Sequence, residues 1–156
     1  MLKYVDYQVV FREIPDTITL AINLSGCPFK CKGCHSSYLQ EDLGVNLSTT
    51  TLDDIIHNNN CAECICFMGG DAFVPELNML LEYIKKYHNK KTAWYSGSDE
   101  ISKLVNFEYL DYYKIGSYKE ELGPLNSETT NQVLYELVHK KDGNIIWKNI
   151  TKKLRK

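Results

Sequence analysis

The sequence lacks a long apolar run, an excess of basic residues and a recognisable leader segment. No stretch reaches the roughly 18 apolar residues of a membrane-spanning helix, so we expect no membrane partner. The formal net charge of −2 argues against general nucleic-acid binding, because neutralising phosphates requires a basic excess. Residues 1–6 show no basic start before an apolar core, so no signal peptide is predicted. Six cysteines in such a chain indicate a reducing compartment, and we expect a cytoplasmic protein.

Linkers, internal repeats and low-complexity segments are also missing from the chain. Its 156 residues are about the length of one domain and are enough to bury a core. The apolar share of 44% and the charged share of 24% are ordinary for a globular protein. We therefore predict a single domain over residues 1–156.

Three cysteines lie close together in the run 26–35, GCPFKCKGCH, with the spacing C-x3-C-x2-C. They are Cys27, Cys31 and Cys34, and they offer three thiolates from one short loop. A cubane [4Fe–4S] cluster has four irons and normally takes four cysteine ligands. A loop with three ligands leaves one iron open to a small molecule, as an open metal site holds substrate.

Other readings of the cysteines are weaker. Zinc motifs usually come as two C-x2-4-C pairs, and ferredoxin runs have a fourth cysteine followed by proline. Neither pattern occurs around the loop, and three neighbouring cysteines cannot all pair as disulfides. Cys61 and Cys64 form a C-x2-C pair compatible with zinc or a redox disulfide, but no second pair completes a zinc site. Cys66 alternates onto a buried strand face and is expected to be a small core residue.

Four apolar runs end in turns rich in glycine and serine, and each run predicts a strand. These strands are Thr17–Leu24, Cys64–Met68, Lys91–Tyr95 and Tyr112–Ile115. Helices are predicted over Ser48–Asn59 with Thr50 or Thr51 as N-cap, from Pro75 through Ile84, and from Ser98 or Asp99 through Val105. The tail is less regular, with candidate strands at Asn131–Val138 and Gly143–Ile150.

Alternating strands and helices predict an α/β fold with a parallel sheet and helices outside it. A complete eight-fold barrel needs about 250 residues, so the length favours an open, partial β/α barrel with a lateral mouth. Parallel α/β sheets bind ligands at the carboxyl ends of their strands. We therefore expect the cysteine loop and the turns at Gly69, Ser96 and Gly116 to lie on one rim.

Three further positions on that rim are candidate ligand contacts. Gly69, Gly70 and Asp71 follow a strand, where glycines allow close backbone approach and the carboxylate adds charge. A plain turn between strand and helix uses the same residues. Ser96 begins a turn that either meets a ligand or only caps a helix. Lys114 lies inside an apolar strand and either pairs with a carboxylate or extends to solvent.

Together these motifs resemble the radical S-adenosylmethionine (SAM) superfamily, in which a three-cysteine loop precedes a Gly-Gly-Glu or Gly-Gly-Asp turn. The later runs 111–118, DYYKIGSY, and 123–132, GPLNSETTNQ, narrow the resemblance to the activating proteins of anaerobic (class III) ribonucleoside-triphosphate reductases. The match covers roughly residues 15 to 137. It implies a partial barrel of the radical SAM type.

The resemblance also implies roles for individual residues. Cys27, Cys31 and Cys34 would bind the [4Fe–4S] cluster, and Gly69, Gly70 and Asp71 would bind the methionine amino group of SAM. The backbone of Gly33, Cys34 and His35 would meet the adenine. If the strand-end residues are ligand contacts, Ser96 would meet the ribose or carboxylate of SAM. Lys114 would pair with the carboxylate of SAM. Gly33 replaces an aromatic residue that is common in the wider superfamily.

The implied reaction is reductive cleavage of SAM. A low-potential donor such as flavodoxin or ferredoxin would reduce the cluster, and the resulting 5′-deoxyadenosyl radical would take a hydrogen atom from a glycine of the reductase. No acid or base is needed, so the sequence indicates no catalytic side chain. Two alternatives stay open: a radical SAM enzyme acting on a metabolite, as 7-carboxy-7-deazaguanine synthase does, and a non-enzymatic iron–sulfur electron carrier.

Overall fold

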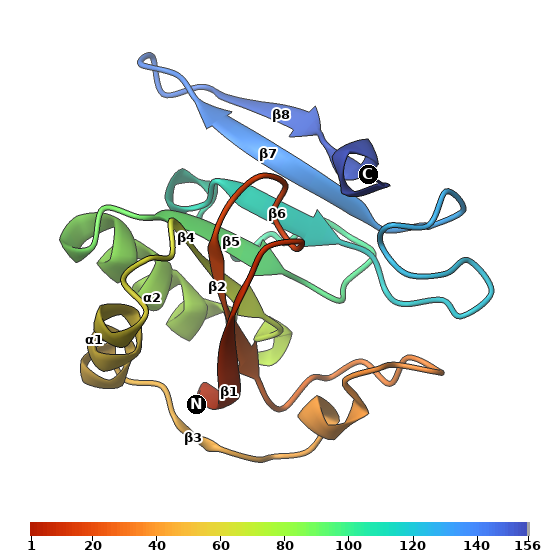
Figure 1. The fold of residues 1–156 in the computed structure, drawn as a ribbon, viewed down its shortest axis with the longest axis horizontal. Coiled ribbons are helices and arrows are strands. Elements are labelled where there is room, and N and C mark those ends of the chain that lie inside the picture. The colour runs from red at the N-terminus through yellow and green to blue at the C-terminus, as the bar shows by residue number, and fades with distance from the viewer. Residues whose placement is uncertain (156) are drawn as a thin grey trace.

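The computed structural model describes residues 1–155 and contains one eight-stranded sheet with two α-helices (Figure 1). The strands are β1 (Lys3–Val10), β2 (Thr19–Leu24), β3 (Val45–Asn46), β4 (Cys64–Met68), β5 (Lys91–Tyr95), β6 (Tyr112–Ile115), β7 (Val133–His139) and β8 (Ile145–Asn149). The α-helices are α1 (Thr49–Asn58) and α2 (Val74–Tyr87), and short 3-10 helices occur at Ser37–Gln40, Asp71–Phe73, Phe107–Tyr109 and Thr151–Arg155. None of the helices within residues 1–155 is long and apolar enough to cross a membrane.

The strands follow the order β3-β1-β2-β4-β5-β6-β7-β8 across the sheet. The central strands β2, β4, β5 and β6 pair in parallel, as the sequence predicts. The outer strands do not: β1 is antiparallel to β2 and β3, β7 is antiparallel to β6, and β8 is antiparallel to β7.

The expected partial β/α barrel of the radical SAM type is therefore wrong. A barrel of that kind continues with parallel strands, each joined to the next by a crossover helix. Here the connection over residues 116–132 contains no helix, and the chain returns through β7 and β8 as an antiparallel hairpin. The result is an open mixed sheet with two α-helices (Figure 1).

The helix expected from Ser98 or Asp99 through Val105 is also wrong, because this segment consists of bends and irregular backbone. The hydroxyl oxygen of Ser102 accepts bonds from the backbone nitrogens of Leu104 at 3.1 Å and Val105 at 3.2 Å. The bond that would start the helix, from Ser102 N to Ser98 O, is missing because both partners are used elsewhere: Ser102 N donates to the Tyr113 hydroxyl oxygen at 2.9 Å, and Ser98 O accepts from Gly116 N at 2.7 Å. A single 3-10 turn at Phe107–Tyr109 is the helical structure that remains.

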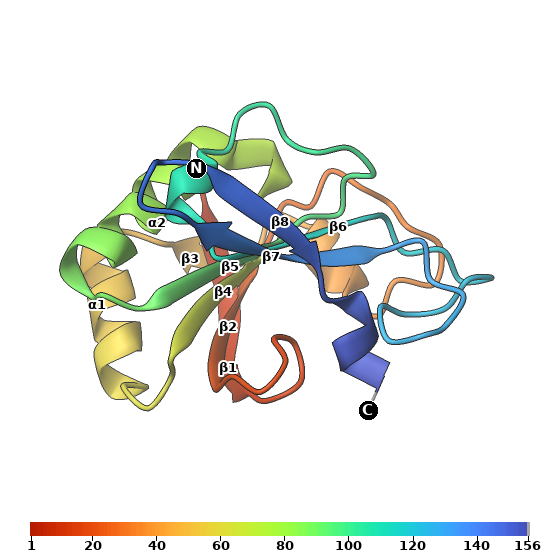
Figure 2. The ribbon, with the colours of Figure 1, turned by 90° about the horizontal axis from the view of Figure 1, so that it is seen from above.

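Both α-helices cover one face of the sheet. Figure 2 shows α1 and α2 together on that side. α1 begins after Ser48, whose hydroxyl oxygen caps the backbone nitrogen of Thr51 at 3.1 Å, so the cap lies before the predicted Thr50 or Thr51. α2 carries Pro75 in its first turn, as predicted. The main core lies between these helices and the sheet, where the fully buried Trp94 and Tyr113 stack at 5.3 Å.

The opposite face has a smaller core, built from the alternate residues of the same strands. Its buried members are Ile14, Cys64, Cys66, Ala93, Tyr112, Leu134 and Ile150. The β1–β2 connection and the C-terminal 3-10 helix Thr151–Arg155 lie on this side (Figure 2). The hydroxyl of Thr151 accepts a 2.9 Å bond from the backbone of Leu134, which attaches that helix to β7.

Because the four central strands are parallel, their carboxyl ends lie along one edge. Hydrogen bonds join the first residues beyond these ends. The backbone nitrogen of Gly69 donates to the Tyr95 oxygen at 3.0 Å, and that of Ser96 donates to the Lys114 oxygen at 2.9 Å. The prediction that the cysteine loop and the following turns share one rim is confirmed for these strands.

Two glycines with positive φ give a matched test of backbone packing. Gly44 has φ +85°, and a Cβ there would lie 2.0 Å from the backbone oxygen of Tyr4. Gly143 has φ +89°, and a Cβ there would have no other residue's atom within 4 Å. Gly143→Ala is expected to cost about 1–2 kcal/mol of unfolding free energy from strain alone. Gly44→Ala should cost about 1–3 kcal/mol more. Urea unfolding measures both, and equal costs would contradict the close approach of β1 and the loop before β3.

Candidate functional site

The cysteine loop leaves the end of β2 and is fixed at its base. Gly26 takes φ +75°, and its backbone nitrogen donates to the Glu41 oxygen at 3.0 Å. The next nitrogen, that of Cys27, donates to the Leu39 oxygen at 2.9 Å. These bonds tie the start of the loop to the 3-10 helix Ser37–Gln40, so the run 27–34 projects from a closed base at the rim.

All three loop cysteines are free thiols with intermediate exposure. Burial raises the pKa of the Cys27 thiol, and the charges of Asp71, Cys31 and Cys34 raise it further. Within residues 1–155, no three Cys, His, Asp or Glu side chains stand in the arrangement of a metal site.

The remaining cysteines lie elsewhere. Cys61 is exposed before β4, whereas Cys64 and Cys66 are fully buried in the core on the sheet face without helices. Burial raises the pKa of both buried thiols, which keeps them protonated and poorly reactive. The core role expected for Cys66 is confirmed by its burial.

Asp71 joins the ends of β4 and β5. Its carboxylate accepts a short hydrogen bond from the Ser96 hydroxyl and a 3.2 Å bond from the Gly97 backbone nitrogen. Burial raises the pKa of the Asp71 carboxyl, while these two bonds and the positive charge of Lys114 act in the opposite direction. Three of the predicted residues, Asp71, Ser96 and Lys114, are therefore brought together by the fold.

Gly69 and Gly70 both have positive φ, at +101° and +89°. The carbonyl oxygen of Gly69 accepts a 2.7 Å bond from the Trp94 indole nitrogen. A Cβ on Gly70 would lie 2.9 Å from Leu24 Cδ1, inside the main core. A side chain at this position would thus disturb the core before it reached any ligand at the rim, so Gly70 also has a packing role.

Lys114 is buried and does not extend to solvent. Its Nζ donates to the backbone oxygens of Ser96 at 3.0 Å and Gly116 at 2.8 Å, which uses two of its three N–H donors. Burial lowers the pKa of Lys114 to about 8, against the attraction of Asp71 and, more weakly, of Cys31, Asp99 and Cys27. The ammonium group is therefore a buried cation that is attracted by the Asp71 carboxylate and, more weakly, by the loop cysteines.

Gly33, Cys34 and His35 face the segment that follows β6. A Cβ on Gly33 would lie 3.1 Å from Cδ of Glu120, and the His35 ring is 5.7 Å from that of Tyr118. Neither Glu120 nor Tyr118 is predicted from the sequence, because no local pattern places residues 117–123 beside the cysteine loop. The structure thus separates the predicted residues into two groups, Gly33–His35 beside this segment and Asp71, Ser96 and Lys114 at the strand ends.

Phe29 is a second residue that the sequence pattern does not indicate. A Cβ on Gly97 would lie 2.8 Å from Cδ2 of Phe29, so the phenyl ring packs directly on the turn after β5. The glycine at 97 is the only local signal of this contact, since it leaves room for a ring from another segment. Phe29 thereby brings the cysteine loop against the turn that carries Ser96.

A family model described as a 4Fe-4S single cluster domain matches residues 18–138, most of the chain. The chain belongs to this family. The match begins with β2 and runs to the end of β7, so it contains the cysteine loop and all four aligned strand ends. No curated protein and no solved structure matches the chain.

The residues of this 4Fe-4S domain suit an iron–sulfur cluster by their chemistry. Thiolates are the ligands of such clusters, and the loop supplies three of them with partial access to solvent. Gly26 and Gly33 have positive φ and give the loop two turns. The buried ammonium group of Lys114 adds positive charge beside the thiolates. The second cysteine group lacks these features, because Cys64 and Cys66 face the core.

The cluster ligands can be tested by substitution. Cys27→Ala, Cys31→Ala and Cys34→Ala should each remove most of the protein-bound iron and sulfide, because a three-ligand loop cannot lose a ligand and still hold a cubane. Cys61→Ala is the matched control, since Cys61 is an exposed free thiol outside the loop. Iron, sulfide and visible absorbance after anaerobic purification measure the effect. Loss of iron from Cys61→Ala as complete as from Cys31→Ala would refute the assignment.

The buried charge of Lys114 makes a prediction about pH. Below pH 8 the residue is protonated in both states, so folding buries the charge at full cost. As pH rises from 8 to its ordinary pKa of 10.5, the folded state loses the proton first and the cost disappears. The unfolding free energy of the wild type should therefore rise by about 1–3 kcal/mol relative to Lys114→Met over this interval.

Urea unfolding at the two ends of the interval measures that difference. Lys140→Met is the control, because Lys140 is exposed at the end of β7 and its charge is solvated in both states. The wild type should show no such gain relative to Lys140→Met. A flat difference between the wild type and Lys114→Met would mean that Lys114 is not buried as a cation.

Proposed function

We propose that this 4Fe-4S domain is the activating enzyme of an anaerobic ribonucleoside-triphosphate reductase and produces a glycyl radical on that partner. Cys27, Cys31 and Cys34 would hold the cluster. SAM would bind along the rim formed by the ends of β2, β4, β5 and β6. The observation that carries the proposal is the group formed by the half-buried Asp71 and the buried Ser96 and Lys114 beside the cysteine loop.

Cys27, Cys31 and Cys34 would hold a [4Fe–4S] cluster and leave one iron without a ligand from the chain, and a bound cluster would supply the electron for reductive cleavage of SAM. The chain's own residues bind, orient and shield the reactants. No side chain needs to act as an acid or a base in this reaction.

The methionine end of SAM carries one ammonium and one carboxylate group, and the rim offers a partner for each. The carbonyl oxygen of Gly69 has one lone pair beyond its bond with Trp94, and the Asp71 carboxylate adds negative charge. Lys114 has one N–H donor beyond its two backbone bonds, which suits a carboxylate. Ser96 would act through Asp71 as a positioning residue, because its hydroxyl is already bonded to that carboxylate.

The adenine end would lie along the backbone of Gly33, Cys34 and His35. The segment 117–123 covers these residues, with the Tyr118 ring 5.7 Å from His35 and the Glu120 carboxylate beside Gly33. Phe29 packs on Gly97 between the cysteine loop and the β5 turn. These contacts would shield the reacting groups from water, which a radical reaction requires.

A large partner does not need a barrel mouth to reach this rim. The sheet is open, and its face opposite α1 and α2 is covered by loops and a 3-10 helix (Figure 2). A glycine-bearing loop of the reductase would approach from this side. A flavodoxin or ferredoxin of low potential would deliver the electron in the cytoplasm, where both kinds of donor and the reductase are expected.

The test is anaerobic incubation of reduced protein with SAM and the reductase encoded in the same genome. We expect the doublet of a glycyl radical in the EPR spectrum together with 5′-deoxyadenosine. Cys31→Ala protein is the matched control and should give neither product, because it lacks a cluster ligand.

Two other results would contradict the proposal, and each would favour a different function. SAM cleavage without a glycyl radical on the reductase would point to a radical SAM enzyme with a small-molecule substrate. A reduced cluster whose EPR spectrum does not change on addition of SAM would point to an electron carrier.

A further inference from the structure

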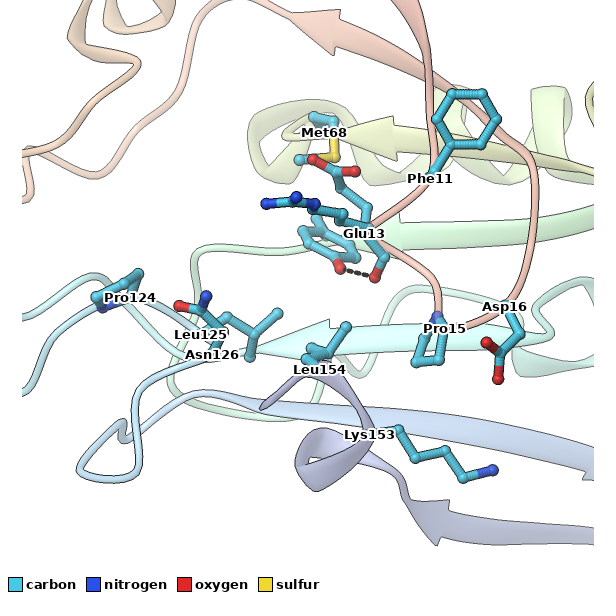
Figure 3. Close-up of a pocket in the computed structure, with 12 residues that line it drawn as sticks. Phe11, Glu13, Pro15, Asp16, Met68, Pro124, Leu125, Asn126, Lys153 and Leu154 are labelled. Atoms are coloured by element: carbon cyan, nitrogen blue, oxygen red, sulfur yellow. Dashed lines mark hydrogen bonds between the residues drawn. The ribbon is translucent and has the colours of Figure 1, made fainter. Parts of the chain in front are cut away.

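A cavity of about 450 Å³ lies on the face of the sheet without α-helices. Its walls come from three parts of the chain and from Met68 and Tyr95 of the sheet. The three parts are residues 11–13, 15 and 16 of the β1–β2 connection, residues 124–126, and residues 153 and 154 near the C-terminal end. Figure 3 shows Phe11, Glu13 and Met68 on one side of this cavity and Leu125 and Leu154 on the other. Its volume lies within the range of ligand-binding pockets.

The cavity borders the proposed SAM site. Met68 directly precedes Gly69, and Tyr95 directly precedes Ser96, so each residue sits one position before a turn of the rim. The Tyr95 ring also lies under Lys114, whose Nζ is 5.9 Å from the ring centroid. A group bound in the cavity would therefore be next to the place where SAM is proposed to react.

Glu13 is the unusual residue of this cavity. Its Oε2 atom is buried and has no hydrogen-bond partner within residues 1–155. The Glu13 backbone is held in place, because the Tyr95 hydroxyl donates a short hydrogen bond to its carbonyl oxygen (Figure 3). Buried polar atoms without partners are rare and unfavourable, and in a binding cavity such an atom is suited to a donor from a ligand. Rotation about the terminal carboxylate bond is soft and can turn this oxygen toward an incoming group.

The neighbouring side chains indicate which class of ligand fits. Arg12 lines the same cavity and is exposed, so it can donate where Glu13 accepts. A peptide segment presents both an N–H donor and a carbonyl acceptor, and this pair complements the carboxylate and the guanidinium. Phe11, Leu125 and Leu154 supply apolar walls, which suit the small or apolar side chains of such a segment.

We infer that Glu13 is a specificity-determining residue that accepts a hydrogen bond from a backbone or side-chain N–H of the partner's glycine-bearing peptide segment. The inference rests on the proposed function, since it assigns that partner's segment to the cavity beside the SAM site. The cavity orients the segment, while the three cysteines and the rim carry the cofactors. The two assignments therefore predict different defects on substitution.

The experiment measures the initial rate of glycyl radical formation as the reductase concentration is varied, with fixed SAM and reductant. Glu13→Gln keeps the volume of the side chain and removes its charge. We expect the half-saturating reductase concentration to rise about tenfold, as for the loss of one hydrogen bond to a charged group, with a smaller change in the rate at saturation. Leu125→Trp, which fills the cavity without changing its charge, should also raise the half-saturating reductase concentration.

Glu63→Gln is the matched control. Glu63 is exposed, directly precedes the amino end of β4, which is the end away from the rim, and lies outside the cavity. It should behave as the wild type, and iron content and melting temperature report folding for every variant. A Glu13→Gln protein with normal iron and an unchanged half-saturating reductase concentration would overturn the inference. Absence of a glycyl radical with the wild type, despite SAM cleavage, would instead overturn the proposed function, so the two failures are distinguishable.

Discussion

The half-buried Asp71 carboxylate connects the parts of this protein that matter most for its chemistry. It bonds Ser96 and Gly97 at the end of the neighbouring strand, and Lys114 from the next strand supplies the opposite charge. A buried charge is strongly unfavourable unless it is paired and hydrogen-bonded, so these groups have to stay together in the folded state. That requirement fixes the relative positions of three strand ends and the turns that follow them.

The mixed sheet gives this rim two different sides. On one side α1 and α2 bury the main core, and a Cβ on Gly70 would meet Leu24 of that core. On the other side the chain returns through β7 and β8, and the C-terminal 3-10 helix packs near the β1–β2 connection, leaving a cavity between them. The antiparallel additions therefore replace the missing parallel strands of a barrel and enclose the space beside the site.

Much of the central sheet could be predicted because its signals are local. Cys64–Met68 and Lys91–Tyr95 are short apolar runs ended by glycine or serine, and both strands have the predicted bounds. The predictions from the sequence were wrong where contacts between distant segments determine the structure. Parallel pairing of four strands does not show how the chain continues after Ile115, and β1 carries too weak an apolar pattern to be recognised without its partner β2. The helix expected after Ser98 does not form, because Ser102 N bonds the Tyr113 hydroxyl and Ser98 O bonds Gly116 N, both from distant positions in the chain.

The sequence by itself determined the donor set, because three cysteines within one short loop stay together whatever the rest of the chain does. It also determined that the turns after the parallel strands share one rim, since parallel pairing aligns strand ends. Only the tertiary structure decided the partners of Lys114, the packing of Phe29 on Gly97 and the cavity around Glu13. These depend on contacts between distant segments, such as the bond of Tyr95 with Glu13 across 82 positions of the chain, and no local pattern encodes such a contact.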